Sequence, residues 1–386
     1  MARLGDICEV VSGTTPKSNI PEYWDGNINW VTPAELNDET AIIYGSQRKI
    51  TEKAVKDSSL KPFPAGTVLL SSRAPIGKVA IAGVEMYCNQ GFKNLICSDK
   101  IHNKYLFWFL KGKTDYLNSL GRGATFKEIS KSIVENIEIP LPSLEKQKQF
   151  SSILDKLTHL ISLHKQQLAK LDELVKARFV EMFGDMLLNP LAWIEEPLEG
   201  MADIVSGITK GRKTQSTELV EVPYMAVSNV KDGYIDWTTV KTIMATQSEI
   251  DQYRILPNDV LMTEGGDPDK LGRGAIIREP LENCIHQNHI FRVRLDRSIV
   301  LPDFFAEYLQ HQKAKQFFLG CAKQTTGIAS INMKQLRALP VLVPPLDNQK
   351  IFANFVGHIG QQKLTIQQSL DKMEVLKKAL MQEYFG

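Results

Sequence analysis

Basic and amide side chains recur in both halves of this 386-residue chain, in segments broken by Gly, Pro and Asn. Lysine and arginine side chains bind phosphate oxygens, and arginine, asparagine and glutamine can form paired hydrogen bonds with base edges. Any one such residue is ordinarily just solvated, but their recurrence makes the set a candidate DNA-binding surface. The candidates are Thr14, Thr15, Lys17, Arg73, Lys78, Asn89, Gln90, Arg122 and Lys127 in the first half, and Lys210, Arg212, Lys213, Asn229, Arg273, Gln287, Asn288, Lys323 and Lys334 in the second.

Residues typical of catalysis or metal binding do not gather anywhere in the sequence. The seven histidines form neither H-x-x-x-H nor H-E-x-x-H, and the five cysteines contain no C-x-x-C pair. The segment from Gly207 to Thr214 approaches a phosphate-binding loop, but Arg212 stands where that loop requires its second glycine. We therefore expect a non-catalytic chain that binds no metal and no cofactor.

Composition limits the class of protein. A chain of this length with 43% hydrophobic residues can bury more than one core, so two or three domains are expected. The formal net charge of +2 allows local basic patches without proving a nucleic-acid partner. An odd cysteine count suits a reducing compartment, and neither a signal peptide nor an 18-residue apolar run is visible. These features predict a soluble, cytoplasmic protein without a membrane partner.

The chain is an internal duplication. Val11-Ser12-Gly13 recurs as Val205-Ser206-Gly207, and the offset stays constant from Leu4/Leu198 to Trp30/Tyr224. A second constant offset runs from Leu144/Leu346 to the matching ends Glu181–Gly184 and Glu383–Gly386. Two similar modules with similar tasks are expected.

Each module begins with a globular part and ends with a long helix. Short β-type runs interrupted by turn residues, followed by the predicted helices 102–113 and 302–318, indicate an α+β fold. The predicted organisation is a first domain (1–142), a long helix (143–184), a linker (185–196), a second domain (197–344) and a second long helix (345–386).

The long helices carry an apolar seam at alternating steps of three and four residues. Lys363 interrupts the second seam, and Gly357 and Gly360 weaken its first turns. Such a stripe needs a partner, and the favoured one is the other helix, packed antiparallel as a coiled coil. The alternative is that each helix folds onto its own domain. The seam residues are Leu154, Leu157, Ile161, His164, Leu168, Leu171 and Val175 in the first helix, and Val356, Ile359, Ile366, Leu370 and Met373 in the second.

Several segments resemble the specificity (S) subunits of type I restriction–modification systems. The run Leu171–Asp185 resembles their central conserved region. The opening Leu4–Ile7 with Ser12–Pro16, Tyr23-Trp24 and Trp30–Pro33 is similar too, as are Pro75–Ile81, Cys88–Phe92, and Pro142 leading to Glu145 and Gln147. The resemblance covers both copies, and the order of the motifs makes it specific.

This resemblance implies a non-catalytic DNA reader with two target-recognition domains. Each domain would bind one half of an asymmetric, bipartite site in double-stranded DNA, and the coiled coil would set the spacing. The helices would also dock two modification (methyltransferase) subunits, which carry S-adenosylmethionine, and restriction subunits with ATP-driven translocase and nuclease activity would join them.

The second copy departs from the family's opening at Ile208-Thr209-Lys210, and Ser72-Arg73-Ala74 is replaced around Gly265-Gly266-Asp267. Both departures suit a domain that reads another sequence. The alternative function is a coiled-coil scaffold that does not bind DNA.

Overall fold

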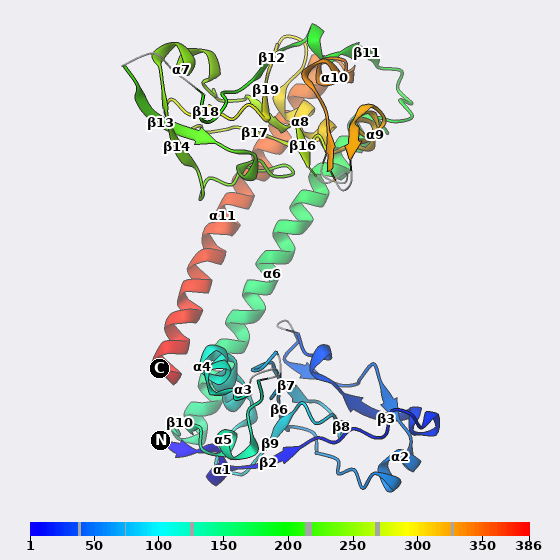
Figure 1. Cartoon of the computed structure of the whole chain (residues 1–386), viewed down its shortest axis with the longest axis vertical. Helices are drawn as coiled ribbons and strands as arrows, with labels where there is room; N and C mark the ends of the chain where they lie inside the picture. Colours follow the sequence, from blue (N-terminus) through cyan, green and yellow to red (C-terminus); the bar gives the residue numbers. More distant parts are fainter. Residues whose placement is uncertain (38–39, 74, 124–126, 213–217, 267–270, 326–327) are drawn as a thin grey trace. The chain divides into compact units, whose positions relative to one another are not determined.

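The computed structural model describes residues 1–37, 40–73, 75–123, 127–212, 218–266, 271–325 and 328–386. They form two compact units, one of Met1–Lys165 with Gln367–Gly386 and the other of Gln166–Ile366. Each unit contains one α+β domain and about half of each long helix, α6 (Leu144–Phe183) and α11 (Leu346–Phe385) (Figure 1). Within the described residues, no helix is long and apolar enough to cross a membrane.

The first domain is built on a five-stranded sheet in the order β2-β9-β6-β7-β4, with a three-stranded sheet β5-β3-β8 beside it. Neighbouring strands of the larger sheet are antiparallel except β4 and β7. The central strand β6 is buried on both faces, as its uninterrupted apolar sequence predicts. The strands are β1 (Ala2–Arg3), β2 (Cys8–Ser12), β3 (Trp24–Val31), β4 (Ile42–Ile43), β5 (Lys49–Ile50), β6 (Val68–Leu70), β7 (Val79–Ala82), β8 (Tyr87–Cys88), β9 (Lys93–Cys97) and β10 (Glu138–Ile139).

Helices close the core of the first domain. In α3 six consecutive residues, Tyr105–Leu110, are buried, because this helix packs between the sheet and the long helices. The helices are α1 (Leu4–Ile7), η1 (Pro21–Tyr23), η2 (Pro33–Glu35), α2 (Glu52–Asp57), α3 (Asn103–Gly112), α4 (Thr114–Leu120) and α5 (Lys131–Glu135).

The second domain repeats this plan. Its main sheet has the order β12-β19-β15-β17, accompanied by the sheets β14-β13-β18 and β16-β21-β20 and the pair β11-β22. The strands are β11 (Ile194–Pro197), β12 (Ala202–Ser206), β13 (Val220–Met225), β14 (Lys241–Ala245), β15 (Val260–Thr263), β16 (Gly265–Gly266), β17 (Gly274–Ile276), β18 (Ile285–His286), β19 (Ile290–Leu295), β20 (Lys323–Thr325), β21 (Ile328–Ser330) and β22 (Pro340–Val343). The helices are η3 (Leu198–Gly200), η4 (Val227–Asn229), α7 (Gln247–Tyr253), α8 (Pro302–Gln310), α9 (Gln312–Cys321) and α10 (Met333–Arg337).

A buried glutamine ties each long helix to its own domain. Gln147 accepts the His102 N–H (2.8 Å) and donates to the Lys100 and Pro142 carbonyls (3.1 and 2.9 Å). Gln349 repeats this pattern with the Leu301 N–H (2.8 Å) and two carbonyls, those of Ile299 and Pro344 (3.0 and 2.8 Å). Because both amides are fully buried and hydrogen-bonded, they fix where each helix leaves its domain.

The repeated Ser-Gly pair has a steric cause. A Cβ added at Gly13 would lie 1.9 Å from the Asn89 carbonyl oxygen, and one added at Gly207 would lie 1.9 Å from that of His286. The residue after each glycine donates its N–H to the facing strand, from Thr14 to Cys88 (2.9 Å) and from Ile208 to His286 (2.8 Å). Only glycine permits this close approach of two backbones.

Burial along the long helices follows the predicted seam. Leu154, Leu157, Ile161, Ile359 and Leu370 are buried. The remaining seam positions are partly buried: His164, Leu168, Leu171, Val175, Val356, Ile366 and Met373. Lys363, the polar interruption, forms an ion pair with Asp172. A charged partner on α6 therefore accommodates this break in the apolar pattern.

Within each unit the two helix halves run antiparallel. In the first unit, Phe150 stacks on Tyr384 (ring centroids 3.8 Å apart) and Lys165 pairs with Glu374 (2.9 Å). In the second, Asp172 pairs with Lys363 and Phe179 contacts Phe352 (5.4 Å). Each half also packs into its domain's core, so both arrangements considered from the sequence, helix on helix and helix on domain, coexist.

Three local features differ from the sequence-based expectation. The predicted helix 302–318 is divided at His311, whose extended backbone (φ −81°, ψ 154°) separates α8 from α9. Part of the predicted linker 185–196 belongs to β11, which pairs with β22. A regular strand, β12, precedes the glycine-containing segment at Gly207, where the sequence predicts no strong strand.

Candidate nucleic-acid interface

Most candidate residues lie in loops at one edge of each main sheet. In the first domain, β2 and β6 end at this edge while β9 and β7 begin there, because adjacent strands are antiparallel. In the second domain β12 and β15 end, and β19 and β17 begin, at the matching edge. We call these loops the first loop edge (residues 13–17, 71–73, 75–78 and 89–92) and the second loop edge (207–212, 264–266, 271–273 and 287–289).

The first loop edge brings together seven of the predicted residues, of which Arg73 pairs with Glu128. The exposed Thr15 hydroxyl contacts Gln90 Oε1, and Lys17 is also exposed. The other members are partly committed to the fold. Asn89 Oδ1 accepts the Gly91 N–H (2.9 Å), and Lys78 Nζ donates to the Pro33 carbonyl (3.4 Å). The last is Thr14, which is exposed but whose carbonyl accepts from the Trp30 indole (3.1 Å).

A short hairpin adds basic residues to this edge. The Arg122 and Glu128 backbones exchange two hydrogen bonds (3.0 and 2.9 Å), and Glu128 also bridges to Arg73. The Glu128 carboxylate binds Arg73 Nε (3.0 Å) and Lys93 Nζ (3.2 Å). Partial burial acts to raise the pKa of Glu128, but its hydrogen bonds to Lys93 and Arg73 outweigh burial and lower it. Arg122 and Lys127 are exposed on the same hairpin.

The second loop edge has the same backbone frame with other side chains. Lys210 is exposed, whereas Arg212 binds the Glu249 carboxylate and the Met244 carbonyl (3.2 Å). The Arg212 hydrogen bond lowers the pKa of Glu249 to about 2. Arg212 therefore stabilises the start of α7. Because its guanidinium is already engaged there, the segment from Gly207 is a poor candidate for a phosphate-binding loop.

The remaining candidate residues of the second loop edge, Arg273, Gln287 and Asn288, are partly buried. Gln287 Oε1 accepts the Val227 N–H (3.4 Å), and Asn288 Nδ2 lies 3.4 Å from His289 Nε2. Arg273 Nε has no hydrogen-bond partner among the described residues. A ligand or solvent at this edge would satisfy that donor.

Asn229 does not belong to this surface. It is fully buried, its Oδ1 accepts the Ala226 N–H (2.9 Å), and its Nδ2 donates to Asp236 and Thr239 (both 3.0 Å). In the first domain Glu35 caps the equivalent turn through the Thr32 N–H (2.8 Å). The prediction that Asn229 contacts DNA is therefore wrong, because its amide is fully used in closing a turn.

Three further candidates lie away from the strand-end loops or cannot be placed. Lys323 starts β20, where it pairs with Ser330 of the strand that also adjoins Gly265. Lys334 is exposed on α10. Lys213 lies outside the described residues.

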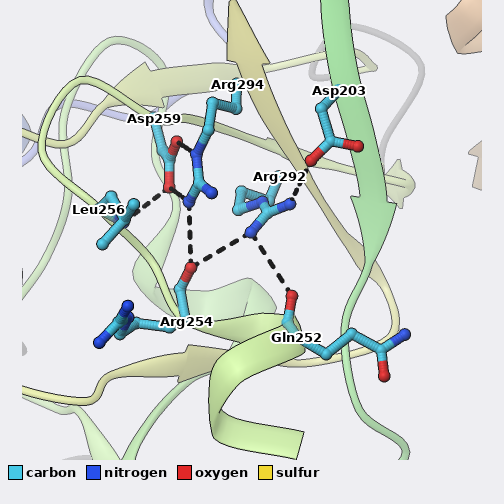
Figure 2. A network of polar contacts seen from close by, with 7 residues as sticks. All are labelled: Asp203, Gln252, Arg254, Leu256, Asp259, Arg292 and Arg294. Carbon is cyan, nitrogen blue, oxygen red and sulfur yellow. Dashed lines mark hydrogen bonds and ion pairs between the residues drawn. The ribbon is translucent and has the colours of Figure 1, made fainter.

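A charge network in the second domain was not predicted from the sequence (Figure 2). Arg294 binds both Asp259 oxygens (2.8 Å each), and Arg292 binds Asp203 (2.6 Å) and the Gln252 and Arg254 carbonyls (3.5 and 3.3 Å). Asp259 and Arg292 are buried, so the network holds β19 against the loop after α7. Alternating arginines in an apolar strand were the sequence signal for it. Glu128 was missed as well, since nothing near it in sequence marks its two partners.

Within the parts of the chain that the structure describes, no three His, Cys, Asp or Glu side chains are arranged to hold a metal ion. His286, adjacent to the candidate Gln287, is fully buried, and burial lowers its pKa to about 3. Its Nδ1 lies 3.1 Å from the Ile290 carbonyl, which suits a neutral ring that donates to the backbone.

The fold and the paired loop edges define a duplicated α+β protein with two long helices. The chain belongs to the type I restriction modification DNA specificity domain family, whose model matches residues 1–173 and 190–375. The resemblance inferred from the sequence is thus confirmed at the family level.

Individual relatives agree with this assignment. The chain is 37% identical over 249 residues to the type I restriction enzyme MjaIX specificity subunit of Methanocaldococcus jannaschii, covering 60% of this chain and 58% of that subunit. It is 22% identical over 341 residues to the EcoKI specificity subunit of Escherichia coli, covering 83% of this chain and 73% of that subunit. The first of these alignments therefore spans less than two thirds of the relative.

Solved structures show the same fold. The S subunit of a type I restriction–modification system from M. genitalium matches with a TM-score of 0.61 at 15% identity, covering 100% of this chain and 95% of that one. A chain from a structural study of type I R-M complex assembly and conformational transition matches with a TM-score of 0.58 at 17% identity, covering 99% and 96%.

Proposed function

We propose that this protein is the non-catalytic, cytoplasmic DNA-recognition subunit of a type I restriction–modification complex. Each loop edge reads one half of an asymmetric, bipartite site in double-stranded DNA. The supporting observation is that two edges with the same backbone frame present different side chains. Arg73, Lys78 and Gln90 characterise the first edge, and Lys210, Arg273 and Gln287 the second.

Two linked readers are needed for physical reasons. One mismatched base pair costs about 1–3 kcal/mol, so a domain that contacts few base pairs discriminates weakly. Linking two domains makes the second binding event intramolecular and combines their discrimination. The antiparallel pairing found within each unit favours the long helices as the link.

The chemistry of the complex belongs to partner subunits in this proposal. Two modification subunits supply S-adenosylmethionine-dependent adenine methylation and dock on the long helices, and restriction subunits supply ATP-driven translocation and cleavage. This chain binds no cofactor. Family membership and the relatives' description as restriction enzyme specificity subunits support this assignment.

The decisive experiment is purification of the chain with its modification subunit, followed by mapping of methylated adenines across a genome. A bipartite motif with two unrelated halves is expected. Replacing residues 1–142 with the corresponding domain of another specificity subunit should change one half only. Absence of salt-dependent duplex binding would instead favour the coiled-coil scaffold, because contacts to phosphates are salt-sensitive.

The helical link has its own test. Deleting 165–171 from α6 and 364–370 from α11 removes one heptad from each, about 10 Å of helix. The expected motif keeps both half-sites but has a spacer shorter by about three base pairs. Deleting only one of the two segments is the control and should abolish assembly. An unchanged spacer after the double deletion would contradict the proposed role of the helices.

A further inference from the structure

Glu128 joins an exposed and a buried basic side chain at the first loop edge. Its Oε2 accepts from Arg73 Nε (3.0 Å), and its Oε1 accepts from Lys93 Nζ (3.2 Å). The Lys93 side chain is only 9% exposed, whereas that of Arg73 is 45% exposed. The carboxylate is therefore anchored from the inside by a lysine and holds an arginine on the outside.

The backbone around this triad is fixed on every side. Glu128 exchanges two backbone hydrogen bonds with Arg122, Ile129 donates to the Ser72 carbonyl (2.9 Å), and Ser72 donates to Gly91 (2.7 Å). Lys93 is the first residue of β9 and lies opposite Ser12 in the sheet. Arg73 and Glu128 are thus paired through their backbones as well as their side chains, so the guanidinium has a defined direction.

Arg73 keeps its outer hydrogen-bonding edge available. Among the described residues its only side-chain partner is Glu128, and that contact uses Nε. Both Nη nitrogens can therefore donate to a ligand. Two parallel N–H donors match the O6 and N7 acceptors of guanine in the major groove.

The carboxylate also decides between a base and a phosphate as the ligand. A phosphate is attracted by net positive charge, and Glu128 offsets one of the two positive charges of Arg73 and Lys93, which weakens that attraction. A guanine edge is uncharged, so its recognition depends more on the orientation of the two N–H donors than on net positive charge. The pairing therefore disfavours phosphate and favours a base.

We propose that Arg73 reads a guanine in the half-site of the first domain, with Glu128 as its positioning residue and Lys93 as the anchor of Glu128. This inference rests on the proposed DNA-recognition function and adds one base identity to it. The second domain lacks the triad, since Gly265, Ser330 and Phe291 occupy the equivalent sheet and hairpin positions. The rule therefore applies to one half-site only.

The test uses the assembled complex with its modification subunits, carrying wild-type chain, Arg73→Ala, Arg73→Lys or Glu128→Gln. Binding and methylation are measured on a duplex library randomised across both half-sites. Arg73→Ala should reduce preference for G·C at one position by about 5- to 150-fold, while preference in the other half-site is unchanged. Arg73→Lys should retain part of that preference. Glu128→Gln should weaken it at the same position, because the guanidinium loses its charged support.

Lys127→Ala is the matched control, since Lys127 is exposed on the same hairpin without taking part in the triad. It should weaken binding to all sequences alike and reduce the salt dependence. The inference is overturned if Arg73→Ala also weakens all sequences equally, or if Glu128→Gln leaves the G·C preference intact. A wild-type complex without any sequence preference would overturn the proposed function itself, and the guanine assignment with it.

Discussion

The two domains share a backbone frame but use charge differently. In the second, the buried Arg292 on β19 pairs with Asp203, and the partly exposed Arg294 pairs with the buried Asp259 (Figure 2). Asn94, Ile96, Glu9 and Thr67 occupy the same register positions in the first domain. Thr67 and Asp259 both bond to the preceding turn, through the Pro64 carbonyl (2.8 Å) and the Leu256 N–H (2.6 Å). Backbone geometry has thus been retained while the side-chain chemistry was exchanged.

The attachment of the long helices differs in the same way. Asp155 on α6 binds Lys104 (2.5 Å) and the Trp108 indole (2.9 Å) of α3. Gly357 stands at the equivalent position of α11, and among the described residues no heavy atom lies within 4 Å of a Cβ added there. The first domain therefore holds its long helix with a polar clamp that the second lacks. The two copies thus differ in how their long helices are held.

The largest expected effect tests whether the second domain holds its long helices through its aromatic core, since it lacks the Asp155 contacts of the first domain. Phe183 is fully buried against Phe179, Phe304 and Phe352. Phe183→Ala should lower the free energy of unfolding by about 3–5 kcal/mol, since it leaves a cavity. Denaturant unfolding with hydrogen exchange should locate the loss in residues 166–366. Leu188→Ala, 76% exposed, is the control and should change stability by less than about 0.5 kcal/mol.

The next effect would separate the second domain, where Asp259 forms an ion pair with Arg294, from the first, where the neutral Thr67 stands at the same position. Asp259→Asn keeps the bond to the Leu256 N–H but removes the charge that faces Arg294. We expect a loss of about 2–3 kcal/mol, below that of a fully buried pair because Arg294 is partly exposed. Thr67→Val, the matched change in the first domain, should cost about 1 kcal/mol. Equal losses in thermal unfolding would contradict the comparison.

The free energy of unfolding of the two domains should also depend differently on pH. The pKa of His286 is lowered by burial to about 3, so its neutral form stabilises the fold above its unfolded pKa of about 6.5. That contribution is lost as the pH falls from about 6.5 towards 3, by about 2 kcal/mol at pH 5. Cys88 occupies the equivalent position in the first domain. His286→Cys should flatten the pH dependence of unfolding in the second domain; an unchanged profile would show that other groups govern it.

The smallest effect concerns the open helix surface. Gly357→Ala and Gly360→Ala each add a methyl group where no heavy atom of the described residues lies within 4 Å. Each should raise the free energy of unfolding by about 1 kcal/mol through helix propensity. Thermal unfolding of the single variants provides the measurement. Destabilisation would mean that the second domain requires flexibility in this part of α11.

Much of the fold could be predicted because it depends on local patterns. The seam from Leu154 to Val175 follows helical periodicity, and the repeated Ser-Gly pairs mark where two backbones touch. Dual packing of the long helices was harder to infer, since Phe179 and Phe183 contact residues far away in sequence. An apolar stripe predicts that a helix is buried without identifying the surface that covers it.

The recurrence of basic and amide side chains in both halves supplied the candidate residues but not their grouping in space. The structure brings Thr15, Lys78 and Gln90 to one edge of the sheet, which the sequence did not specify. Selection by residue type wrongly included Asn229, because an amide that caps a turn is the same residue type as one that reads a base. Glu128 was not predicted because its role is to bind Arg73 and Lys93. Only the sheet and the hairpin bring these two residues close to it.

The packing of Phe385 bears on how the chain is synthesised. This residue, one from the C-terminal end of the described chain, is 3% exposed and fits among Tyr105, Phe109 and Leu154 in the core of the first unit. A ribosome releases the amino-terminal domain long before it has made the helix that completes that core. Until α11 has been synthesised, the aromatic site that Phe385 fills stays open to solvent, and a nascent chain in this state is a natural client for a chaperone.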